Sequence, residues 1–200
     1  MGSSSRRDAV RNRAALVAAA EEVFREAGAT APLHLVAARA NLGRGTLYRH
    51  FPDRAALVAA VYERRVDALE ALAPTLPAER SLEQLVVEIA HLQLDVPGLL
   101  SAVQGSADAP NLLAEVELRT RALLDAALAT ARDLAEVRDD VTLDDVLLTF
   151  AMIDGVIAGE APERVEASVH RALRLALRAL LSTDRPPPAP RLVDRPDAQD

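Results

Sequence analysis

Five polar side chains gathered within seven consecutive residues offer the clearest chemistry in the sequence. They are Arg44, Thr46, Tyr48, Arg49 and His50. An arginine can bond O6 and N7 of guanine at once, whereas hydroxyl and imidazole groups commonly bond phosphate oxygens. The chemistry that this combination favours is contact with a DNA duplex.

Two short predicted helices position these side chains. The first covers residues 32–39, with a proline at the first helical position, and Asn41 tolerates the left-handed turn that follows. The second covers residues 44–50 and buries Leu47 and Phe51, one turn apart. Two short helices joined by a tight turn form a helix-turn-helix, whose second helix enters the major groove.

Longer predicted helices flank this pair. An apolar stripe that includes Leu16 and Phe24 predicts a first helix that ends at Gly28. A fourth helix, capped by Asp53, covers residues 53–73. At 1.5 Å per residue it is roughly 30 Å long, which is enough to join two domains.

The segment from Ala40 to Phe51, ANLGRGTLYRHF, and the DRAAL that begins at Asp53 resemble the signature of TetR-family repressors. With the first helix the resemblance covers about residues 10–60. It implies a homodimeric transcriptional regulator, usually a repressor, that a small molecule releases from its operator. The helical remainder fits the family's variable ligand-binding and dimerisation domain.

The resemblance also implies roles for individual residues. Arg44 stands where base contacts are usual, and His34 occupies another position that commonly faces DNA. Positions of usual phosphate contact are occupied by Thr46, Tyr48, Arg49, His50 and Arg54. Gly43 and Gly45 belong to the same contact segment, and Gly45 lets the backbone approach the duplex closely.

Three positions depart from the family pattern: Ala31 replaces a capping threonine, Asn41 a glycine and Gly43 a serine. Gly43 matters most, because it removes one hydroxyl contact to phosphate and a cap on the second short helix. We therefore expect weaker or differently ordered DNA binding, not its loss. A plainer alternative for Tyr48 is a core aromatic residue, and for His34 and His50 a solvated surface position.

Charge divides the chain unevenly. Residues 1–65 hold 11 arginines against 6 acidic residues, a net charge of +5, whereas residues 66–200 hold 12 against 24, a net charge of −12. A basic segment on an acidic remainder predicts one part that meets a polyanion. The N-terminal arginines have two interpretations of about equal weight. They form a basic arm that reaches an adjacent groove of the DNA, or they lie on a frayed, solvated chain end.

Composition excludes several classes of protein. The chain has no cysteine, so disulfides, thiolate metal sites and cysteine nucleophiles are impossible. It has neither an apolar run long enough to span a bilayer nor a signal-peptide segment, and we expect a cytoplasmic protein without a membrane partner. The sequence contains no HExxH motif, no Gly-rich phosphate loop and no Gly-x-Ser-x-Gly elbow. We therefore expect that the protein is not an enzyme and that it has no cofactor, catalytic residue or metal site.

The fold class predicted is all-α, with about nine helices and no period-two strand. After the fourth helix, helices are expected near 81–95, 97–105, 111–136, 142–159 and 163–182. Ser81 with Gln84, and Thr142 with Asp145, have the spacing of capping boxes at two of the helix starts.

The expected domains follow from these elements. They are a flexible arm over 1–9, a helix-turn-helix domain over 10–56, an effector-binding and dimerisation domain over 57–182, and a disordered, proline-rich tail over 183–200.

The last two predicted helices are apolar on more faces than their own domain can cover. A second copy of the chain is the natural cover, in a four-helix contact, and a twofold dimer requires a palindromic operator. The residues expected at this interface are Gly155, Gly159, Val169, Leu173, Leu177 and Leu180.

Polar residues on otherwise apolar stripes suggest a ligand cavity. They are Gln93, Glu117, Thr120 and Asp154. Plainer alternatives are a pair of Glu117 with Arg121, a bond from Thr120 to its own helix backbone, and a place for Asp154 in the dimer contact. Because four of the five aromatic residues lie within residues 1–65, the predicted effector domain is mainly aliphatic, which favours an apolar ligand.

The alternative function is a helical protein-interaction module that keeps the helix-turn-helix fold without binding DNA. Salt dependence separates the two, because phosphate contacts weaken steeply with salt and a mainly apolar interface need not.

Overall fold

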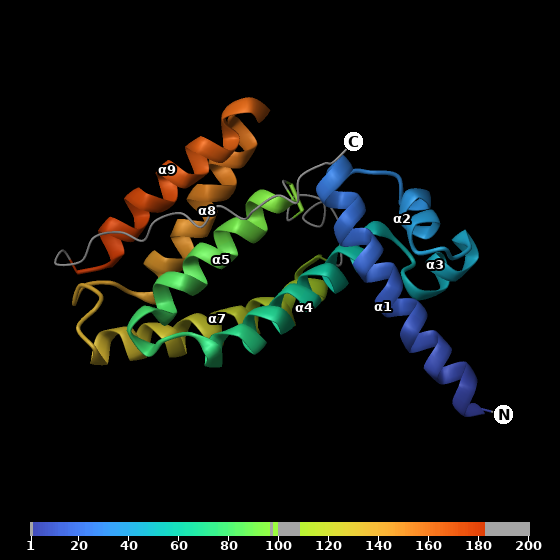
Figure 1. Ribbon diagram of the computed structural model, residues 1–200, viewed down its shortest axis with the longest axis horizontal. Helices are drawn as coiled ribbons and strands as arrows, with labels where there is room; N and C mark the ends of the chain where they lie inside the picture. Colours follow the sequence, from blue (N-terminus) through green and yellow to red (C-terminus); the bar gives the residue numbers. More distant parts are fainter. Residues whose placement is uncertain (1, 97, 100–108, 183–200) are drawn as a thin grey trace, which may run out of the picture.

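The computed structural model describes residues 2–96, 98–99 and 109–182. This part of the chain contains eight α-helices and confirms the all-α prediction (Figure 1). The helices are α1 (Gly2–Ala27), α2 (Leu33–Arg39), α3 (Arg44–His50), α4 (Arg54–Leu72), α5 (Ser81–Asp95), α7 (Ala109–Asp133), α8 (Leu143–Gly159) and α9 (Pro162–Leu180), with single 3-10 turns η1 (Ala73–Thr75) and η2 (Ala78–Arg80) before α5.

Two segments predicted from the sequence fall almost entirely outside the described residues. The helix expected over 97–105 and the tail expected over 183–200 lie outside them, apart from residues 98–99. At the other end, α1 begins at Gly2, so residues 2–9 continue the first helix where an arm was expected. The chain has neither proline nor glycine between residues 3 and 27 to interrupt it.

Helices α1, α2, α3 and the first half of α4 share one apolar cluster at one end of the molecule (Figure 1). Phe24, Leu47 and Phe51 are at most 2% exposed and fill its centre. The two turns predicted from the sequence have left-handed residues, Gly28 at φ 80° and Asn41 at φ 53°. These turns set α3 against α1 and α4 with one face outward.

A second apolar cluster forms where α5, α7, α8, α9 and the end of α4 meet. In Figure 1, α7 runs alongside α4 and α9 alongside α8. Leu124, Leu128 and Ile153 are at most 1% exposed in this cluster. No helix among the described residues combines the length and the apolar character that a membrane span requires.

Helix α4 is shared by both clusters. Leu57, Val58 and Val61 lie in the first cluster and Leu69 in the second, along one uninterrupted helix. Val96, at the end of α5, also packs into the first cluster. The two parts of the chain are therefore joined by packed helices.

The apolar stripe of α9 corrects one expectation about the dimer interface. Four residues expected there, Val169, Leu173, Leu177 and Leu180, are at most 5% exposed within the chain itself. They pack on α5 and α8, which cover the face of α9 on which these four residues lie. These four residues therefore belong to the core of the chain itself.

Helix starts agree with the sequence in two cases and differ in one. Asp53 accepts a bond from the backbone N–H of Ala56 at 2.8 Å, and Thr142 and Asp145 form the predicted reciprocal capping box. The capping box predicted from Ser81 is wrong, because the turn η2 precedes α5 and the Ser81 hydroxyl donates to the carbonyl of Ala78 instead.

Arg54 differs from the expectation of a phosphate contact. Its guanidinium donates to the carbonyls of Ala29 and Ala31 at 2.6 and 2.7 Å and lies 5.9 Å from the ring centre of Phe24. These contacts fasten the turn between α1 and α2 to the start of α4. We therefore count Arg54 among the residues that stabilise the domain.

Replacing Thr142 with alanine should lower the free energy of unfolding by about 1 kcal/mol at neutral pH, because α8 loses its cap. The difference in the free energy of unfolding between wild type and Thr142→Ala should become smaller at acid pH. Bonds from the side chain and backbone of Thr142 hold the pKa of Asp145 below its ordinary value, so the stability they contribute is lost as the pH falls through the folded-state pKa. Urea unfolding at pH 7 and pH 3 measures both effects, with Thr30→Ala, in an exposed turn, as the control. A penalty in Thr142→Ala that does not change with pH would contradict the role of Asp145.

Replacing Arg54 with methionine should lower the free energy of unfolding by about 2 kcal/mol, because two carbonyls lose a charged donor. The matched control is Arg44→Met, whose exposed guanidinium should contribute little to stability. Urea unfolding of both variants, followed by circular dichroism, makes the comparison. Equal midpoints for the two variants would remove the structural role from Arg54.

Candidate nucleic-acid interface and ligand cavity

The outer face of α3 carries the side chains that the sequence analysis singled out. Arg44, Tyr48 and Arg49 are exposed, and 53% of Tyr48 is accessible, which argues against a core role for that ring. Thr46 and His50 are half-buried at the edges of the same face, whereas Leu47 points inward. Arg49 donates to the Thr46 hydroxyl at 3.3 Å. The face therefore combines cationic and hydroxyl groups.

The backbone at the start of α3 is open. A Cβ atom added to Gly43 or Gly45 would meet no other atom within 4 Å, so neither glycine is required by packing inside the chain. Gly43 is the N-cap of α3 and, as predicted, gives it no side-chain cap. His34 lies exposed on the neighbouring helix α2.

Ion pairs distinguish the arginines of α3 from six other arginines of the first 65 residues. Among the described residues, Arg44 and Arg49 have no acidic partner. The paired arginines are Arg11 with Asp8, Arg13 with Glu63, Arg25 with Asp95, Arg39 with Glu22 and Glu26, and Arg64 and Arg65 with Glu21. The exposed charges of Arg44 and Arg49 are thus available to an outside anion.

A cavity of about 420 Å³ lies between α4, α5, α7 and α8. The four polar residues predicted from the apolar stripes all line it: Gln93, Glu117, Thr120 and Asp154. Most of the remaining wall is apolar, with Leu69, Ile89, Val116, Leu147 and Phe150 among the lining residues. The arrangement suits a small molecule with a large apolar body.

The polar residues of the cavity wall differ in how many of their polar groups already have a hydrogen-bond or ion-pair partner within the chain. Glu117 pairs with Arg121 at 3.2 Å and Thr120 donates to its own helix at Val116, so both plainer alternatives are present. Gln93 donates to the carbonyl of Phe150 at 3.1 Å. Burial raises the pKa of the Asp154 carboxyl, and a bond from Gln93 opposes the shift in part.

Three polar residues of the cavity were not predicted to line it: Tyr62 and Arg65 on α4, and Arg121, which was expected only as a partner of Glu117. Burial raises the pKa of the Tyr62 phenol, and the negative charge of Asp154 adds to the shift. Arg65 is only 5% exposed. The two α4 residues lie at helical spacing on the apolar stripe that includes Val58 and Leu69, which is the signal that pointed to Gln93 on α5.

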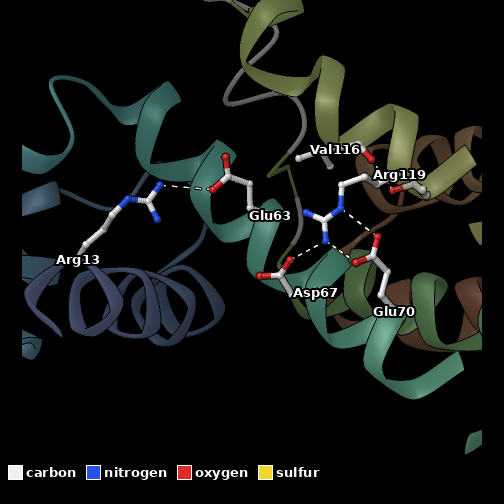
Figure 2. Close-up of polar contacts among 7 residues, drawn as sticks. Arg13, Glu63, Asp67, Glu70, Val116 and Arg119 are labelled. Carbon is white, nitrogen blue, oxygen red and sulfur yellow. Dashed lines mark hydrogen bonds and ion pairs between the residues drawn. The ribbon is translucent and has the colours of Figure 1, made fainter. Parts of the chain in front are cut away.

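Ion pairs join α4 to its neighbours on both sides (Figure 2). Arg13 extends from α1 to Glu63 of α4, with 3.4 Å between nitrogen and oxygen. Arg119 reaches from α7 to Glu70 at 2.9 Å and to Asp67 at 2.6 Å. Helix α4 is therefore tied both to the helix-turn-helix cluster and to a wall of the cavity.

A second surface feature is an open groove between α8 and α9, whose lining is mainly apolar but includes Glu160, Ser168 and Arg171. Met152, Gly155, Gly159 and Leu175 line it, and Leu148 lies exposed one turn before Met152. Leu148, Met152 and Leu175 are each at least 50% exposed. The two glycines expected at an interface thus lie on an exposed face.

The model of the family described as bacterial regulatory proteins, tetR family, matches residues 16–61, which span the helix-turn-helix. No curated protein matches the sequence. Among solved structures, a TetR transcriptional regulator of Streptomyces coelicolor is 30% identical with a TM-score of 0.62, over 86% of this chain and 99% of that one.

Two further structures extend the comparison. A TetR transcription regulatory protein of Mycobacterium vanbaalenii is 31% identical with a TM-score of 0.61, over 88% of this chain and 99% of that one. SmeT, the repressor of the SmeDEF multidrug efflux pump of Stenotrophomonas maltophilia, is 23% identical with a TM-score of 0.57, over 88% and 94% of the chains, and shares the fold. From the helix-turn-helix match and the near-complete overlap with two relatives at 30% identity or more, the chain belongs to the TetR family of DNA-binding transcriptional regulators.

Proposed function

We propose that the protein is a homodimeric repressor that binds a palindromic operator and leaves it when a small molecule fills the cavity. The observation that carries the proposal is the pair Arg44 and Arg49 on the outer face of α3. Both are exposed and without an acidic partner in the part of the chain that the structure describes, whereas the acidic residues nearby are paired elsewhere. A regulator of this kind acts where the bacterial chromosome lies, in the cytoplasm.

Arg44 reads base edges in this proposal, because it lies on the first turn of the helix that enters the groove. The remaining side chains of the face, Thr46, Tyr48, Arg49 and His50, bond phosphates and fix the register. His34 contacts the backbone from α2, and the open backbone at Gly43 and Gly45 permits close approach. Arg54 supports this surface from behind.

A second copy of the chain covers the groove between α8 and α9. The exposed apolar residues Leu148, Met152 and Leu175 suit a partner that presents the same apolar face, and Gly155 and Gly159 allow helices to approach closely. Regulators of the TetR family typically act as dimers. A twofold axis places two α3 helices on half-sites about 34 to 36 Å apart.

The effector site in this proposal is the cavity lined by α4, α5, α7 and α8. Its apolar wall favours a largely apolar molecule, and its first wall, α4, continues into the helix-turn-helix cluster. A ligand that moves α4 therefore moves α3 relative to the partner's copy. This gives the small molecule a direct physical route to the DNA.

Replacing Arg44 with alanine should reduce discrimination between operator and random DNA by about 1 to 3 kcal/mol, because one base contact is lost. The operator is first recovered by incubating the protein with fragmented DNA of its source and sequencing what is retained. Affinity is then measured over a range of salt concentrations. Arg138→Ala, an exposed arginine far from α3 in the sequence, is the matched control and should behave as wild type.

Two outcomes would contradict the DNA-binding assignments. Unchanged discrimination in Arg44→Ala would remove the base-reading role from that residue. Absence of any enriched DNA at low salt, with ligand-free dimeric protein, would favour the alternative of a helical protein-interaction module and would direct attention to Gly43.

Replacing Leu175 with arginine should convert the dimer into a folded monomer, because a charge enters the apolar interface. The matched control is Leu118→Arg, on the exposed side of α7, where 64% of the side chain is accessible. Mass from light scattering after size exclusion distinguishes the two species. A dimeric Leu175→Arg variant would place the interface elsewhere.

A further inference from the structure

Two buried polar atoms have no hydrogen-bond partner within the described part of the chain. They are Nη2 of Arg65 and Oε1 of Gln93, and both residues line the effector cavity. One atom is a donor and the other an acceptor. Since buried polar groups are nearly always paired, a donor and an acceptor left over in one cavity point to a bound molecule that pairs with both.

Neighbouring bonds fix the direction of each unpaired atom. The Nε of Arg65 donates to Glu21 of α1 at 3.1 Å and its Nη1 donates to the carbonyl of Leu92 in the last turn of α5. Gln93 follows Leu92, and its amide nitrogen is taken by the carbonyl of Phe150, which leaves the amide oxygen as the free group. Neither side chain can turn away without breaking these bonds.

The charges around this end of the cavity oppose a ligand with a net charge. The guanidinium of Arg65 is already paired with the carboxylate of Glu21, with 3.1 Å between nitrogen and oxygen. An anionic group that approached Arg65 would also approach the carboxylate of Glu21, and a cationic group that approached Gln93 would meet the guanidinium of Arg65, which bonds the neighbouring Leu92. The other charged residues in the wall, Glu117 and Arg121, neutralise each other.

We propose that the effector is a neutral molecule with an apolar body and one head group that both accepts and donates hydrogen bonds, such as an amide, a lactam or a hydroxyl group. The head group accepts from Nη2 of Arg65 and donates to Oε1 of Gln93, and the body fills the space around Leu69, Ile89 and Phe150. This inference rests on the proposed effector site and adds the chemical class of its ligand. A carboxylate lacks the donor, and an ammonium group lacks the acceptor.

The test uses four probes with the same eight-carbon length and different head groups: octanamide, 1-octanol, octanoate and octylammonium. Because the apolar part is nearly constant, differences in affinity report the head group. Isothermal titration calorimetry at pH 7 with the full-length dimer should show octanamide and 1-octanol binding at least tenfold more tightly than the two charged probes.

Variants of Gln93 assign the preference to this end of the cavity. Gln93→Met removes the acceptor while it keeps the length of the side chain, and it should reduce the preference for octanamide over octanoate by at least fivefold. Gln84→Met, the same change on α5 at a residue that does not line the cavity, should leave the preference unchanged. Equal binding of all four probes, tighter binding of a charged probe, or no binding of octanamide would overturn the inference.

Release from operator DNA is measured separately, by fluorescence anisotropy with each probe present. Tight octanamide binding that leaves DNA affinity unchanged would support the head-group assignment and would contradict effector release. Release by octanoate or octylammonium alone would support effector release and overturn the head-group assignment. The two proposals therefore fail through different results.

Discussion

The shared helix α4 is the constraint on which the rest of the structure depends. Its first half lies in the apolar cluster of the helix-turn-helix and its last turns lie in the second cluster, without a proline or glycine between them. At 1.5 Å per residue its 19 residues form a rod of roughly 28 Å. The orientation of α3 is therefore set by elements that also enclose the cavity.

Contacts of two kinds fasten α4 to its neighbours, and they differ in strength. Leu57, Val58 and Val61 are completely buried and make the helix-turn-helix cluster move with α4 as one body. The pairs of Arg119 and of Arg13 lie at the surface, where exposed ion pairs contribute little and exchange easily. Arg65 is the exception, because it is buried and bonds α1 and α5 at once. Arg65 thus connects the wall of the cavity to α1 through a buried side chain.

The sequence predicted local features well and long-range pairing less well. Gly28, Asn41 and the cap at Thr142 depend on neighbours a few residues away, and all three behave as expected. The α9 stripe was misassigned because periodicity shows that a helix face is buried without showing whether its own chain or a second copy covers it. The structural bonds of Arg54 were not predicted for a related reason, since its carbonyl partners lie 23 and 25 residues away.

The cavity residues show the same limit of sequence-based prediction, because a pattern within one helix does not show which other helices it meets. Gln93, Glu117, Thr120 and Asp154 were found because a polar residue on an apolar stripe is visible in one helix, and the fold brought all four to one space. Arg65 carries the same signal on α4, and its positive charge is also part of the net charge of +5 of the first 65 residues, which predicts a segment that meets a polyanion.

The two unpaired atoms of the cavity connect stability with recognition. Each buried donor or acceptor without a partner costs about 1 to 3 kcal/mol, which a well-packed apolar residue at the same place would avoid. A site of this kind rejects ligands that lack the matching group far more strongly than an apolar pocket rejects a ligand of the wrong size. Arg65 also bonds Glu21 of α1, so the ligand that pairs its free nitrogen changes the surroundings of a residue fastened to the helix-turn-helix cluster. In this proposal the guanidinium of Arg65 both selects the effector and links the bound effector to α1.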